Sequence, residues 1–208
     1  MGIYAESNSS NYKQMEPGVY PAICQMMVQI GTVPNPFHRP DDSESKEMRH
    51  EVFLRWEFPT ETHVFSESRG PEPYTIGRTF TLSMHEKAGL RKLLESWRGK
   101  AFNDEEAKRF DISKLLGKPC QINVVSREKN GKTYSEIGSI SPLMKGSKAP
   151  DPINPQIMLS FEDWDEGIYQ SLPDWLKKRI AESEEYKAMH GEVIAPPPPA
   201  SDDDDLPF

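Results

Sequence analysis

Long apolar runs are missing from this chain of 208 residues. No stretch approaches the roughly 18 uninterrupted apolar residues of a membrane-spanning helix, and the first residues lack the basic and apolar regions of a signal peptide. Cysteine is scarce too, since Cys24 and Cys120 are the only two and lack the C-x-x-C spacing of a zinc site. We therefore expect a soluble cytoplasmic protein, with no membrane partner and two reduced thiols in its core.

Motifs of the common enzyme classes are also missing. Gly131-Lys132-Thr133 resembles the end of a phosphate-binding loop, but Ser126 stands where that loop needs its first glycine. The five histidines show neither H-x-x-x-H nor H-E-x-x-H spacing. The four aspartates near the C-terminus have no fixed scaffold for a two-metal site. We expect no catalytic activity, no cofactor and no metal.

Charge is distributed unevenly. Residues 1–150 hold 21 Lys and Arg against 19 Asp and Glu, whereas residues 151–208 hold 4 against 14. Proline is abundant, at 19 residues, and ten of them lie in the last 67 residues. This division predicts a nearly neutral folded body and an acidic, proline-rich end with a different role.

Hydrophobic patterning predicts five strands, at residues 19–30, 48–58, 74–82, 119–127 and 132–140. Four alternating residues of the second strand form the face that we assign to the core: Val52, Leu54, Trp56 and Phe58. Phe53 and Arg55 lie on its opposite face, which we expect to point outward. Between the last two strands, Asn130-Gly131 predicts a tight hairpin turn.

A helical segment separates the third and fourth strands. Ser83 and Glu86 have capping-box spacing before a leucine-rich face that includes Trp97, and Gly99 is expected to stop this helix. A second short helix is expected to start at Asn103. Three strands, a helical segment and two strands follow the order of the OB-fold, a partly open Greek-key barrel. We therefore expect a mainly β protein: a flexible N-terminus over residues 1–16, then a five-stranded OB-fold barrel with an inserted helix over residues 17–142.

Three further parts are expected after the barrel. Residues 143–170 are predicted to be a linker, and residues 171–191 an amphipathic helix. One face of that helix would carry its apolar residues: Leu172, Trp175, Leu176 and Ile180. Residues 192–208 are predicted to be a disordered acidic tail in which four consecutive prolines form a stiff spacer.

The C-terminal residues carry the most specific signal: Asp202, Asp203, Asp204, Asp205, Leu206, Pro207 and Phe208. An acidic run with an apolar end fits a basic, hydrophobic partner pocket, and a tail that only aids solubility is the alternative. This segment resembles the acidic tip of bacterial single-stranded DNA-binding proteins. Residues 84–98, 118–123 and 131–134 resemble a family of bacteriophage single-stranded DNA-binding proteins. The resemblance implies that the barrel coats single strands during phage replication or recombination in the host cytoplasm, and that the tip recruits partner enzymes.

Binding of single strands requires cations along the phosphates and aromatic rings for the bases. Candidates lie in the first loop, on the second and third strands and in the last hairpin: Phe37, Arg39, Phe53, Arg55, Tyr74, Arg78, Arg127, Lys129, Lys132 and Tyr134. Glu51 and Glu57 flank Arg55 and would repel phosphate there. Two alternatives stay open: a recruitment adaptor of the replication machinery that does not bind DNA, and a metal-dependent nuclease. A homo-oligomer is also compatible with the sequence.

Overall fold

The computed structural model of the protein describes residues 13–42 and 45–191. The strands are β1 (Gly18–Pro34), β2 (Met48–Ser66), β3 (Gly70–Thr81), β4 (Pro119–Lys129), β5 (Lys132–Ser141) and β6 (Ile157–Leu159). The helices are α1 (Gly89–Arg98), α2 (Asp104–Lys108), the 3-10 helix η1 (Ile112–Leu115), α3 (Glu166–Ser171), α4 (Asp174–Ala181) and α5 (Glu184–Met189). Within these described ranges, no helix is long and apolar enough to cross a membrane.

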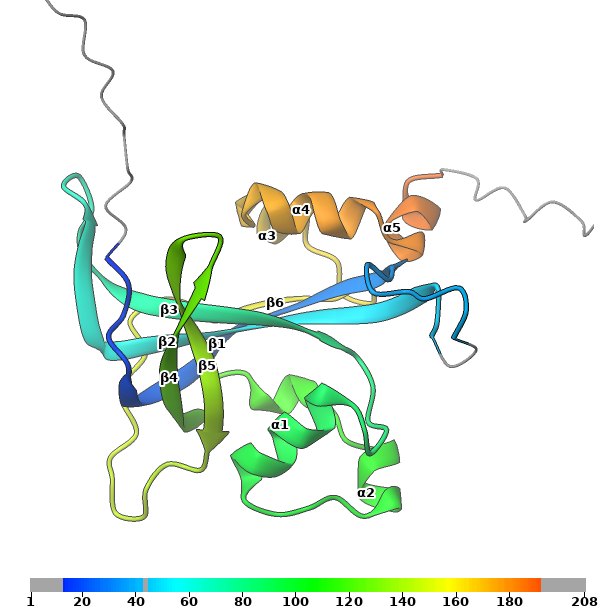
Figure 1. The fold of residues 1–208 in the computed structure, drawn as a ribbon. Helices are drawn as coiled ribbons and strands as arrows, with labels where there is room; N and C mark the ends of the chain where they lie inside the picture. The colour runs from blue at the N-terminus through cyan, green and yellow to red at the C-terminus, as the bar shows by residue number, and fades with distance from the viewer. Residues whose placement is uncertain (1–12, 43–44, 192–208) are drawn as a thin grey trace, which may run out of the picture.

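Five strands form an antiparallel path in the order β3-β2-β1-β4-β5 (Figure 1). The first part of β1 pairs with β4, and its later residues Met26–Val28 pair with the short parallel strand β6 as well as with β2. The described strands include no hydrogen-bonded pairing of β3 with β5, so the sheet is open between them. The expected mainly β class, with helices between the third and fourth strands, is confirmed.

Helices cover both faces of the sheet. Figure 1 shows α1 and α2 on one side and α3, α4 and α5 on the other. One core lies between the sheet and α1, and it contains Trp56 and Trp97, as the sequence predicts. A second core lies under the C-terminal helices and contains Phe53, Leu176 and Ile180. Because successive strand residues point to opposite faces, β1 and β2 supply side chains to both cores.

The hairpin of β2 and β3 is longer than expected. We predicted a loop after Phe58, but β2 continues to Ser66 and pairs with a β3 that already begins at Gly70. The strand pairing accommodates Pro71 and Pro73 because both lie in an edge strand. At an edge, a residue without an N–H need not remove a hydrogen bond between strands. The pairing is irregular between Phe58 and Thr62, around the remaining proline of this segment.

Several predicted ends of elements are confirmed and one is wrong. Gly99 ends α1 with φ of 67°, and the side chain and backbone of Asn103 form a capping box with Glu106 at the start of α2. Asn130 and Gly131 both have positive φ, as the tight turn between β4 and β5 requires. The predicted capping box at Ser83 is wrong, because its hydroxyl accepts from His85 N in a turn and α1 begins only at Gly89.

The linker predicted for residues 143–170 is wrong over its second half. β6 adds to the sheet, α3 follows it, and Leu159 and Tyr169 are buried. The single helix predicted for residues 171–191 is divided in two, because the Ser183 hydroxyl accepts from Tyr186 N and starts α5 as a new helix. This C-terminal layer folds back on β1 because its apolar side chains match those on the outer face of the strand.

Two predicted flexible ends fall mostly outside the described residues. Residues 1–12 and the tail at residues 192–208, including its acidic tip, lie outside them. Of residues 13–16, which we expected to be flexible, two are held by the fold: Met15 is buried, and the Gln14 side chain accepts from Ser135 N of β5 at 2.9 Å.

Candidate nucleic-acid interface

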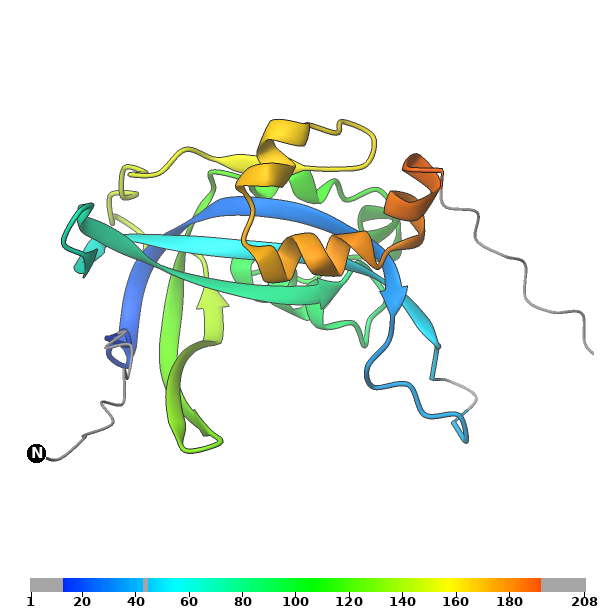
Figure 2. The same cartoon turned by 90° about the horizontal axis from the view of Figure 1, so that it is seen from above.

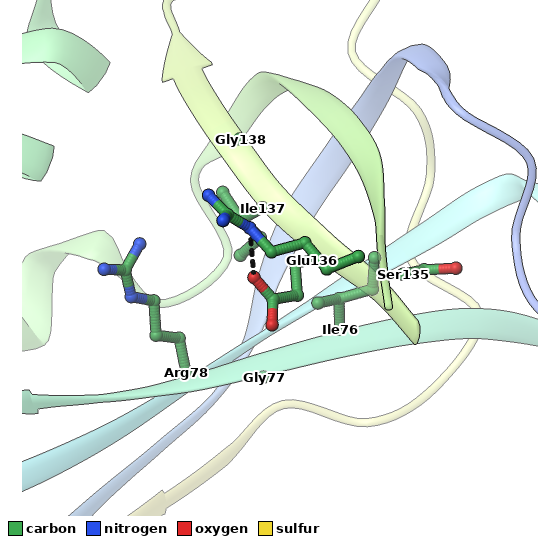
Figure 3. A pocket seen from close by; sticks show the side chains of 8 residues that line it. Ile76, Gly77, Arg78, Ser135, Glu136, Ile137 and Gly138 are labelled. Atoms are coloured by element: carbon green, nitrogen blue, oxygen red, sulfur yellow. Dashed lines mark ion pairs between the residues drawn. The ribbon is translucent and has the colours of Figure 1, made fainter. Parts of the chain in front are cut away.

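A groove lies where the sheet is open, between β3 and the β4–β5 hairpin. It encloses about 450 Å³ and is lined by Ile76, Gly77, Arg78, Arg127, Ser135, Glu136, Ile137 and Gly138. Figure 3 shows Arg78 on β3 and Glu136 on β5 pointing into the same space. Two arginines that are far apart in the sequence, Arg78 and Arg127, therefore line one groove.

Arg78 is an exposed cation on the wall formed by β3. It lies directly opposite Leu54 in the β2–β3 register, on the inner face of the sheet, and it reaches solvent because β3 is an edge strand. Its guanidinium carbon is 5.2 Å from the centre of the Phe80 ring. Among the residues that the structure describes, no ion pair involves Arg78. No carboxylate among the described residues therefore neutralises the charge of Arg78.

Arg127, on the opposite wall, has an acidic partner that we did not predict. Its Nε lies 3.0 Å from Oε2 of Glu136, and the two side chains are 69% and 54% exposed. Ion pairs this exposed contribute about 0–1 kcal/mol, because water screens both charges. A phosphate can therefore replace Glu136 as the partner of Arg127 at little cost in stability.

The β4–β5 hairpin presents four of the predicted residues on one face. Arg127 lies directly opposite Tyr134, and Lys129 directly opposite Lys132. Because side chains alternate along a strand and opposed residues share a face, these three cations and one ring point the same way. All four are exposed, and Tyr134 is 43% exposed. The hairpin is thus a cationic ribbon with an aromatic side chain at its centre.

The loop between β1 and β2 extends from the same side of the sheet as this hairpin (Figure 2). It carries Phe37, which is 73% exposed, and Arg39, which is also exposed. The guanidinium of Arg49 lies 5.4 Å from the centre of the Phe37 ring, a cation–π contact that the sequence analysis missed. Seven predicted residues are therefore exposed around one side of the sheet: Phe37, Arg39, Arg78, Arg127, Lys129, Lys132 and Tyr134.

Two predicted aromatic contacts with DNA are wrong, because both rings are buried. Phe53 is only 7% exposed, because α4 covers the outer face of β2 and its Trp175 packs edge-to-face on the Phe53 ring at 5.2 Å. Tyr74 is 8% exposed, lies opposite the core residue Phe58, and packs against Phe65 at 5.1 Å. Neither ring is available to a nucleic-acid base in this structure.

Arg55 also differs from the prediction. Its Nε and one terminal nitrogen donate to the Gln25 side-chain oxygen at 3.0 and 2.8 Å, and the Gln25 amide nitrogen donates in turn to the Pro155 carbonyl. Burial lowers the pKa of this guanidinium, and the charge of Glu57 opposes that shift. Arg55 therefore lies on the outer face of β2, as we expected, but it is half-buried and bound to Gln25 within the fold.

The two glutamates that flank Arg55 in sequence bind the C-terminal segment. Glu51 is buried and forms ion pairs with Arg49 and Arg179. Glu57 is buried and accepts from the backbone N–H groups of residues 153 and 154 at 2.8 and 2.9 Å. Their charges are satisfied within the fold, so neither lines the groove.

The thiols are confirmed as core residues. Cys24 and Cys120 are free and buried, and burial raises the pKa of Cys24 to about 12 and that of Cys120 in the same direction. Within residues 13–42 and 45–191, no group of three or more His, Cys, Asp or Glu residues could hold a metal ion.

Comparison with known proteins gives no further guide to this interface. No family model matches the chain, and a search of curated proteins finds no match.

Proposed function

We propose that this protein binds single-stranded DNA with little sequence preference, as a phage-type protein of DNA replication and recombination. The observation that carries the proposal is the groove that Arg78 and Arg127 both line, beside the cationic face of the β4–β5 hairpin. Polyanion binding needs such a convergence of cations. The proposed role is that of a binding protein and not of an enzyme.

The proposed fold of the body is an OB barrel that is open between β3 and β5. The strand order β3-β2-β1-β4-β5 and the helices between β3 and β4 support it. In OB-folds, ligands bind near strands 2 and 3 and the loops that join strands 1–2 and 4–5. The exposed candidates come from both of these loops and from the third strand, which agrees with that mode of binding.

The proposed mechanism combines charge and stacking. Lysine and arginine side chains around the groove neutralise phosphates, and bases stack on the exposed rings of Tyr134 and Phe37. Stacking is tolerant of sequence because every base has a π-face. Sequence preference should therefore be weak.

The acidic tip is proposed to recruit partner enzymes. This part of the proposal rests on the sequence of residues 202–208 and on its resemblance to bacterial single-stranded DNA-binding proteins, since the tip lies outside the described residues. Its four aspartates would also compete with DNA for the cationic groove when no partner is bound.

Fluorescence anisotropy of a labelled oligo-dT tests the proposal with the full chain. We expect saturable binding at low salt and clear weakening in an Arg78→Ala, Arg127→Ala double variant. A Lys145→Ala, Lys148→Ala variant is the matched control, because it removes two exposed cations from the loop after β5, away from the groove. Absence of binding by the wild-type protein would refute the proposal and favour the adaptor. Cleavage of the oligonucleotide in magnesium would favour the nuclease.

A further inference from the structure

Trp175 is an exposed ring on a helix that is otherwise anchored in the core. Its helix α4 buries Leu176 and Ile180 completely, yet the Trp175 side chain is 53% exposed. A tryptophan that only filled the core would be covered like Trp56, which is 0% exposed. About half of the surface of Trp175 is therefore available to a ligand.

The indole lies on the outer face of β2, and one ring separates it from β3. It packs edge-to-face on Phe53, with ring centres 5.2 Å apart and planes inclined by 79°. Phe53 in turn lies directly on Gly77, where an added Cβ would be only 2.2 Å from the tip of the Phe53 ring. Gly77 lines the groove between β3 and the hairpin. Only one ring and one strand therefore separate Trp175 from the proposed DNA path.

Helix α4 also carries Lys178, a cation that pairs with no acidic residue in the part of the chain that the structure describes. Lys177 pairs with Asp174 at 3.0 Å, and Arg179 is bound to Glu51. Lys178 is exposed and forms no ion pair with any described residue. Residues three apart on a helix are neighbours on its surface, so Lys178 lies next to Trp175.

We infer that Trp175 and Lys178 form a second subsite for single-stranded DNA, in which one base stacks on the indole and Lys178 neutralises a neighbouring phosphate. This inference rests on the proposed function. From the sequence we expected Phe53 to stack with a base on this face, but in the folded protein α4 covers that ring and places Trp175 against it. The C-terminal layer is then part of the binding surface and extends the DNA path from the hairpin across Gly77.

The packing of Trp175 suits a stacking role. Phe53 supports one side of the indole, so less rotamer freedom remains to be lost when a base binds. Asp174 is the nearest acidic residue along the chain, and its ion pair with Lys177 reduces its repulsion of phosphate. A ring with an adjacent free cation is the combination that sequence-tolerant binding of single strands uses.

Tryptophan fluorescence gives a direct test. The chain has four tryptophans, of which Trp56 and Trp97 are buried and Trp164 is half-buried. Titration of the full chain with unlabelled oligo-dT should quench the emission, and most of the quenching should be absent in Trp175→Phe. A Trp164→Phe variant is the control and should retain it. Quenching of equal size in Trp175→Phe and the wild type would overturn the inference.

Affinity is measured in parallel by anisotropy with labelled oligo-dT. Trp175→Ala should bind about 5- to 150-fold more weakly, the range expected for one stacked base, whereas Trp175→Phe should retain most of the affinity. Lys178→Ala should reduce the salt slope by about 0.7 and is informative even if Trp175→Ala does not fold. Unchanged affinity in Trp175→Ala and an unchanged slope in Lys178→Ala would overturn this inference alone. Absence of binding by the wild type would instead refute the proposed function.

Discussion

Replacing the two lysines at the end of the β4–β5 hairpin should flatten the salt dependence of DNA binding. Lys129 and Lys132 lie directly opposite each other, are exposed, and form no ion pair with any described residue. Their truncation removes no buried contact, so the Lys129→Ala, Lys132→Ala variant should unfold at the same temperature as the wild type. Any change in binding then reports on charge and not on stability.

The magnitude follows from the number of exposed cations that we assign to DNA. These are Arg39, Arg78, Arg127, Lys129 and Lys132 around the groove, and Lys178 in the second subsite. If each neutralises one phosphate at about −0.7 in the slope of log K against log salt, the wild type should show about −4.2 and the double variant about −2.8. Between 50 and 200 mM salt, affinity should then fall about 300-fold for the wild type and about 50-fold for the variant.

The assay is anisotropy of labelled oligo-dT at four or more salt concentrations, with the full chain. The Lys145→Ala, Lys148→Ala variant has the same change in net charge and should keep the wild-type slope. Equal slopes in all three proteins would show that the hairpin does not contact phosphates. Equal reductions in both variants would show that only net charge matters, and the groove would lose its assigned role.

Four further predictions follow from the same structure. Glu136→Gln should tighten binding of oligo-dT and steepen its salt slope, because Arg127 loses its acidic competitor; weaker binding in anisotropy would contradict the assignment. Deletion of residues 202–208 should strengthen binding at low salt and abolish pull-down of partner enzymes, and no change in either assay would remove the role of the tip. Both cysteines should resist a thiol reagent at pH 8 until the protein unfolds, because burial keeps Cys24 protonated with a pKa of about 12; rapid labelling of the native protein would show that the core opens. Leu176→Ala should lower the free energy of unfolding in urea by about 2–5 kcal/mol, because Leu176 is fully buried against the sheet. An unchanged midpoint would mean that α4 is not part of the cooperative fold.

Local features of the fold follow from the sequence, because they depend on neighbouring residues. The alternation of Val52, Leu54 and Trp56 sets which side chains of β2 share a face, and Asn130-Gly131 sets the turn that fixes the hairpin register. The four exposed residues of that hairpin could be predicted for the same reason. The short strand β6 could not, since three residues give too little periodicity to recognise.

Which faces are covered is decided only by the tertiary structure. The alternating pattern of β2 places Phe53 on the face that we expected to be exposed to solvent. Helix α4, which comes from far along the chain, buries it instead. Trp175 falls within an apolar helical pattern, but Leu172, Leu176 and Ile180, spaced four residues apart, occupy the core positions. Trp175 therefore remains about half exposed to solvent. The sequence determines how each strand and helix divides its own side chains between faces. Burial depends on which distant segment packs there, because a side chain leaves water only when another surface covers it.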